Sequence, residues 1–153
     1  MIRSFARRAL PVVAAAFVAC GLVQVFLAGL GVFDDPASFV THREFGYLLG
    51  WFTLAMLVLA LLGRERRLIV GLTVLVLVQF TFQSVFVALR TTYPAVAALH
   101  PVNGFLLLVV GIAIARLSWV ARHEPARSTA AAPAPAADAR PAADARPAAV
   151  EGG

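Results

Sequence analysis

Two histidines stand in matched settings along this chain, and they are the residues best suited to chemistry. His42 and His100 each follow a proline by six positions and precede a glycine by four, in the pattern Pro-x5-His-x3-Gly. A neutral imidazole offers one ring nitrogen to a metal while the other nitrogen donates a hydrogen bond. Two such rings on neighbouring helices would serve as the axial ligands of a single metal atom.

The residues around the two histidines indicate which metal group would fit. Gly46 and Gly104 follow the histidines by one helical turn and share their faces, where a glycine lets a flat group or another helix approach closely. Two inward histidines related by a two-fold axis suit the axial ligation of one haem b, with the iron bound by both rings. Arg43 and Arg90 lie near the same membrane level, where they would pair with the haem propionates.

Polar residues inside apolar runs leave other interpretations open. Gln24, Gln79 and Gln83 would satisfy the histidine Nδ1–H groups or simply hold helices together. The two histidines equally fit a structural polar contact near the membrane interface, or another cofactor or proton site.

The elements that would position these residues are four long apolar runs. The chain has 153 residues, of which 61% are hydrophobic and 14% charged, whereas soluble domains are about half apolar and about a quarter charged. The runs cover about 9–33, 37–62, 68–89 and 94–120. Each is long enough to cross about 30 Å of hydrocarbon as a helix. The sequence therefore predicts an all-α protein, an integral membrane four-helix bundle.

Charge placement predicts the organisation and orientation of this bundle. We expect a basic N-terminus over 1–8, a membrane domain over 9–122 and a disordered tail over 123–153, rich in Ala, Pro and Arg. Arginines gather before the first run, between the second and third, and after the fourth. The positive-inside rule then predicts a protein of the plasma membrane with both termini in the cytoplasm.

The matched histidine segments also suggest an internal duplication of an αα-hairpin. Besides the Pro-x5-His-x3-Gly pattern, the preceding runs carry Val23-Gln24 and Val78-Gln79. Two hairpins in one orientation imply a pseudo-two-fold axis along the membrane normal. We expect Pro36 and Pro94 to start their helices, and Pro101 to kink the last helix just after His100.

Three segments carry resemblances to known families. VQVFLAGLGVF, THREFGYLLG and LHPVNGFLLL resemble an uncharacterised family of small four-span bacterial membrane proteins, which implies the fold alone. His42-Arg43-x-x-Gly46-x-x-x-Gly50 is also similar to one four-helix half of haem A synthase, a resemblance that implies His42 and His100 as the axial pair. That family's catalytic half has an acidic residue where this chain has Phe39, and some members have a cysteine pair where this chain has only Cys20 within a span. The resemblance therefore implies haem binding more than haem oxidation.

These observations favour electron transfer or haem handling with a quinone or a redox partner protein. The alternative is a membrane accessory or assembly protein without a cofactor, in which glycines pack helices. A transporter is disfavoured because no acidic residue lies clearly within a run. Nucleic-acid binding is disfavoured because no basic face is interleaved with aromatic residues. Whether the protein is an enzyme, and its oligomeric state, are left open by the sequence.

Overall fold

The computed structural model describes residues 1–123, and every regular element within them is a helix. The order is α1 (Ile2–Phe33), α2 (Ser38–Gly63), α3 (Arg67–Ala88), the short α4 (Pro94–Ala97) and α5 (Leu99–His123). Four helical stretches are long and apolar enough to cross a membrane, the last being α4 and α5 together. The predicted four-helix membrane bundle is confirmed. The predicted disorder of the tail concerns residues outside the described ones, apart from His123, which ends α5.

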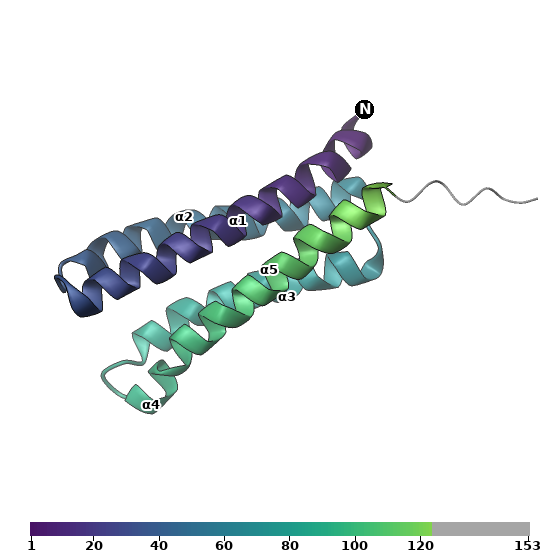
Figure 1. Cartoon of the computed structure of the whole chain (residues 1–153). Coiled ribbons are helices and arrows are strands. Elements are labelled where there is room, and N and C mark those ends of the chain that lie inside the picture. The colour runs from purple at the N-terminus through teal and green to yellow at the C-terminus, as the bar shows by residue number, and fades with distance from the viewer. Residues whose placement is uncertain (124–153) are drawn as a thin grey trace, which may run out of the picture.

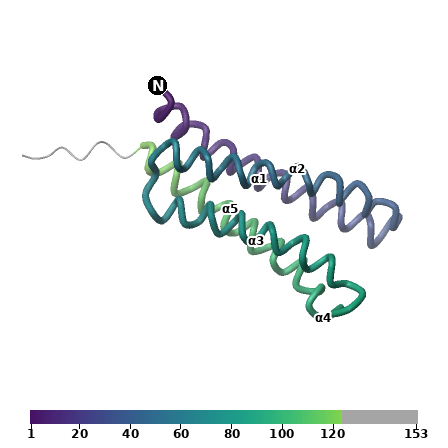
Figure 2. Tube along the Cα trace, turned by 180° about the vertical axis from the view of Figure 1, so that it is seen from behind, coloured from purple at the N-terminus to yellow at the C-terminus, as the bar shows by residue number. Residues whose placement is uncertain are grey.

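The four long helices form two antiparallel hairpins, α1 with α2 and α3 with α5. α1 packs against α2 and α5, and α3 packs against the same two helices, so α2 and α5 face each other across the diagonal of the bundle. Figures 1 and 2 show from opposite sides that the hairpins converge at the end holding the N-terminus and diverge towards α4. Large apolar side chains cover the outer surface of every long helix, as is typical of helices solvated by lipid.

The convergent end, here called the arginine end, holds the N-terminus of α1, the α2–α3 turn and the C-terminus of α5. The nine charged residues described there are Arg3, Arg7, Arg8, Arg64, Glu65, Arg66, Arg67, Arg116 and Arg122. The Glu65 side chain is only 2% exposed and pairs with Arg7 at 3.3 Å. Arg7 also donates to the Ala121 carbonyl at 3.2 Å, and Arg3 donates to the Gly63 carbonyl at 3.3 Å. These contacts tie α1 to the ends of α2 and α5.

The α2–α3 turn shows why its glycine precedes the left-handed residue. Arg64 adopts φ 50°, a conformation that ordinarily favours glycine or asparagine after a helix. Gly63 instead lies one position earlier, where α1 approaches closely and a Cβ would lie 3.2 Å from Arg7 Cγ. The close approach of α1 therefore needs the glycine, and Arg64 takes the left-handed position with its N–H bonded to the Leu61 carbonyl at 3.0 Å.

The hydrophobic core lies in the half of the bundle nearest the arginine end. Its main members are Leu10, Ala14, Phe17, Leu49, Met56, Ala60, Ile69, Val76, Leu107, Ile114 and Ala121. At the opposite end, here called the histidine end, residues 22–48 and 77–106 are all described and only Gly31 among them is buried. The interior of the histidine end is therefore not filled by a packed apolar core.

Local structure at the histidine end agrees in part with expectation. Pro94 is the first residue of α4, as predicted. Pro36 instead lies in a turn before α2, and its carbonyl accepts the Phe39 N–H at 3.1 Å. The kink expected after His100 is replaced by a break before it, at Ala98 between α4 and α5. Pro101 explains the break, because its ring would clash with the carbonyl four residues back in a continuous helix.

Candidate functional site

His42 on α2 and His100 on α5 lie across the bundle diagonal and meet in its interior. Their ring centroids are 6.2 Å apart and the ring planes are inclined by 67°. Both side chains are half-buried. The helices that carry them do not pack directly against one another. The two imidazoles therefore reach from opposite sides into the space that the hairpins enclose.

Each histidine is held by a backbone carbonyl of its own hairpin. His42 Nδ1 lies 3.1 Å from the Gln24 carbonyl on α1, and His100 Nδ1 lies 3.3 Å from the Gln83 carbonyl on α3. A carbonyl oxygen only accepts, so each Nδ1 carries a proton, and in the neutral ring Nε2 then keeps its lone pair. A backbone bond of this kind fixes the tautomer and orientation of metal-binding histidines. Both rings are thus prepared to offer Nε2 to a metal.

The glycines one turn after the histidines make room for these glutamines. A Cβ at Gly46 would lie 2.7 Å from Gln24 Nε2, and one at Gly104 would lie 3.3 Å from Gln83 Nε2. Each glycine thus admits the glutamine of the helix next to it. At each glycine the structure shows the close approach of a glutamine side chain from the neighbouring helix. Their membership of a cofactor site stays a prediction.

Asn103 is a polar residue of this site that the sequence reasoning missed. It lies three positions after His100 on α5, and its Nδ2 donates to the Gln79 carbonyl at 2.8 Å and to Gln83 Oε1 at 2.9 Å. The available signal was its polarity within an apolar run, one turn from a singled-out histidine. Asn103 also ties α5 to α3 at the level of the histidines.

Gln24 and Gln79 each keep a buried side-chain oxygen that has no hydrogen-bond partner among the described residues. Phe45 explains the first of these. It occupies the position on α2 that matches Asn103 on α5, so Gln24 has no counterpart of the amide that satisfies Gln83. Buried polar atoms without a partner are rare and point to a bound water or ligand group.

The two arginines expected at the site lie at its edge. Arg43 is exposed and donates to Glu44 at 2.8 Å. Arg90 is also exposed, and its Nη1 donates to the Val87 carbonyl at 3.2 Å. Neither is joined by a hydrogen bond or ion pair to the histidines in the described part of the chain. Their pairing with haem propionates stays a prediction.

The donor set fits a metal carried within a larger group. Residues 1–123 contain no cluster of three or more His, Cys, Asp or Glu side chains that could hold a metal ion by themselves. A metal between His42 and His100 would therefore need further ligands from a group such as a porphyrin. Two imidazoles with Nε2 at about 2.0 Å from one metal have ring centroids roughly 6 Å apart, which agrees with the observed 6.2 Å.

Together these features define a four-helix membrane protein with a polar, histidine-bearing interior at one end. A protein-family model described as Family of unknown function (DUF6220) matches residues 24–91, from Gln24 on α1 through α2 to the loop after α3. The match includes His42 and Gln83 but stops before His100. No curated protein and no solved structure matches the chain. The resemblance to haem A synthase therefore stays an expectation from the sequence.

Proposed function

We propose that the histidine end binds one haem b through His42 and His100, and that the protein serves electron transfer or haem handling in the membrane. The observation that carries the proposal is the pair of rings 6.2 Å apart, each with its Nδ1 held by a backbone carbonyl. Two further features support it: the interior of this end has no packed apolar core, and the side-chain oxygens of Gln24 and Gln79 are buried without a partner among the described residues. A quinone or a redox partner protein is the proposed exchange partner.

In this proposal the chain binds, orients and shields the group. Both histidines supply Nε2, and the Gln24 and Gln83 carbonyls prevent ring rotation and fix the protonated nitrogen. Asn103 holds α5 on α3, which keeps His100 in position. A bound haem would supply reversible one-electron chemistry. The surrounding apolar helices would exclude water from it.

The test is a reduced-minus-oxidised visible spectrum of the purified full chain, expressed with ample haem. We expect a low-spin b-type spectrum that is lost in both His42→Ala and His100→Ala. The matched control is His123→Ala, because His123 is exposed at the opposite end of the bundle and should leave the spectrum unchanged. A chain that folds but carries no chromophore would remove the haem proposal.

The second candidate is an accessory or assembly protein without a cofactor. One observation favours it: rings at 6.2 Å and 67° also fit an edge-to-face aromatic pair that joins the two hairpins. Under this function, His42→Phe would preserve the contact and the activity of the assembly. The same replacement abolishes bis-histidine ligation, so the spectrum and this variant separate the two functions.

We further propose that the two hairpins arose by duplication, which the matched Pro-x5-His-x3-Gly segments support. We also propose that both termini lie in the cytoplasm of a plasma-membrane protein. The arginine end holds eight arginines and one described acid, whereas the other end holds two arginines and three acids. In a Cys20→Ala background, Asp35→Cys should react with a membrane-impermeant maleimide on intact cells, and Arg67→Cys should not. The reverse labelling pattern would overturn this orientation.

A further inference from the structure

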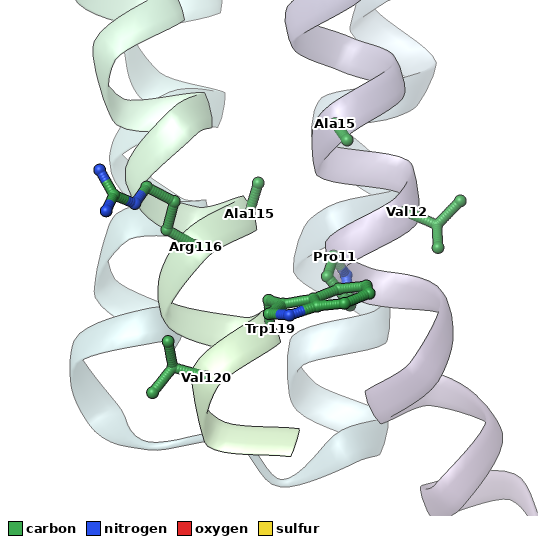
Figure 3. Close-up of a pocket in the computed structure, with 7 residues that line it drawn as sticks. All are labelled: Pro11, Val12, Ala15, Ala115, Arg116, Trp119 and Val120. Carbon is green, nitrogen blue, oxygen red and sulfur yellow. The ribbon is translucent and has the colours of Figure 1, made fainter. Parts of the chain in front are cut away.

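A groove between α1 and α5 near the arginine end lies outside the histidine site. It has a volume of about 560 Å³ and is lined by Pro11, Val12, Ala15, Ala115, Arg116, Trp119 and Val120. Figure 3 shows Trp119 reaching from α5 towards Pro11, with Ala15 and Ala115 on the two facing helices. Small side chains on both helices keep the groove open. It faces the lipid-covered surface of the bundle.

The lining combines an apolar floor with a cationic edge. Val12 and Val120, at the edges of the groove (Figure 3), are 60% and 54% exposed, so no other described part of the chain covers it. Arg116 lines the groove from α5 with its guanidinium directed away from α1 (Figure 3), and it makes no hydrogen bond or ion pair within residues 1–123. The Arg122 guanidinium lies 4.1 Å from the centroid of the Trp119 ring. Cations and an indole at one level are typical of the membrane–water interface.

Spacing brings a further cation to the groove from α1. Arg8 precedes Val12 by four residues and Ala15 by seven, which places it on their face one turn nearer the N-terminus. Arg8 is exposed and makes no hydrogen bond or ion pair in the described chain. Arginines of both helices therefore lie near the groove, and within residues 1–123 Glu65, already paired with Arg7, is the sole acid at this end.

We propose that this groove binds an anionic phospholipid of the adjoining leaflet. An acyl chain lies against Val12, Ala15 and Ala115, and the headgroup phosphate contacts Arg116 and Arg122. Basic pockets between membrane helices are suited to anionic headgroups. A second copy of the chain is a poorer occupant, because its arginine end would bring eight like charges against these.

The experiment uses the full chain with Trp51→Phe, so that Trp119 is the single tryptophan. The chain is reconstituted in phosphatidylcholine vesicles with a minor fraction of brominated phosphatidylglycerol or, separately, brominated phosphatidylcholine. We expect brominated phosphatidylglycerol to quench Trp119 with an association constant at least about fivefold higher, the size expected for one arginine near an anionic surface. Arg116→Gln should remove most of that preference.

Two further variants separate a specific site from general attraction. Arg67→Gln removes the same charge from the same end but lies on α3, away from the groove, and should keep the preference. Ala115→Phe fills the groove without changing charge and should weaken quenching by both lipids. Soluble glycerol phosphate should not compete, since it has no acyl chain. Equal quenching by both lipids, equal losses in Arg116→Gln and Arg67→Gln, or competition by glycerol phosphate would each overturn the proposal.

Discussion

Gly21 on α1 and Leu108 on α5 meet where the two hairpins pack together, and Gly29 offers a matched comparison on the same helix. A methyl group at Gly21 would overlap Leu108 Cδ2, whereas one at Gly29 would meet no atom within 4 Å. Leu108 is only 9% exposed, so it has little free space to move into. Gly21→Ala should therefore force the helices apart, and Gly29→Ala should be tolerated.

The expected magnitude follows from the difference between the two variants. Replacing glycine by alanine within a helix favours the helix by up to about 1 kcal/mol, and this gain cancels when the two variants are compared. The overlap with Leu108 remains, and overpacking of this kind costs about 1–3 kcal/mol. The equilibrium constant for unfolding should thus be about 5- to 150-fold larger for Gly21→Ala than for Gly29→Ala.

The assay is unfolding of the detergent-solubilised chain by titration with SDS, followed by far-UV circular dichroism. A double-mutant cycle with Leu108→Ala supplies the control, since removing the leucine should make room for the new methyl group. The double variant should then lose less unfolding free energy than the two single variants lose together. If Gly21→Ala is as stable as Gly29→Ala, or if the cycle shows no coupling, this account of the α1–α5 contact is wrong.

Three other substitutions test the two ends of the bundle separately. Gly46→Ala places a methyl group 2.7 Å from Gln24 Nε2, whereas Gly104→Ala places one at a looser 3.3 Å from Gln83 Nε2. Any haem spectrum should therefore be disturbed more by Gly46→Ala than by Gly104→Ala. An equal or reversed effect would contradict the role given to Gly46. Glu65→Gln breaks the pair with Arg7, whose side chain is 35% exposed, so we expect a loss of about 2 kcal/mol, between the values for exposed and buried pairs. The same SDS titration measures that loss, and a change below about 0.5 kcal/mol would show that the pair is dispensable.

The helices and their ends were predictable because lipid imposes strong rules on sequence. Continuous apolar runs must form helices to satisfy their backbone groups, and charges or prolines must stand between them. The second run was expected to end near 62 and α2 ends at Gly63; the third was expected over 68–89 and α3 spans Arg67–Ala88. One difference lies at the start, where α1 begins at Ile2 and continues through the basic residues. The contacts of Arg3 and Arg7 with other helices account for that extension.

The site was predictable only where two copies of a pattern reinforced each other. His42 and His100 were found because their surroundings match, and the structure brings them together. The equivalent roles of Gln24 and Gln83, whose carbonyls each contact one histidine Nδ1, were not found. The sequence pattern matched Gln24 with Gln79 instead. Which residues meet depends on the rotation and tilt of each helix, and helices that are apolar on all sides do not encode these in their hydrophobic pattern.

The depth of the histidine site restricts what a haem bound there could do. His42 lies 21 residues before the end of α2 at Gly63, which is roughly 30 Å along the helix axis, a full hydrocarbon thickness. The other histidine in residues 1–123 is His123, which is exposed at the arginine end and contacts Trp119. The described chain therefore offers no second histidine pair to relay an electron across the bilayer. A redox partner would have to approach from the histidine end, past the exposed Arg43 and Arg90, or reach the site laterally from within the membrane, as a quinone can.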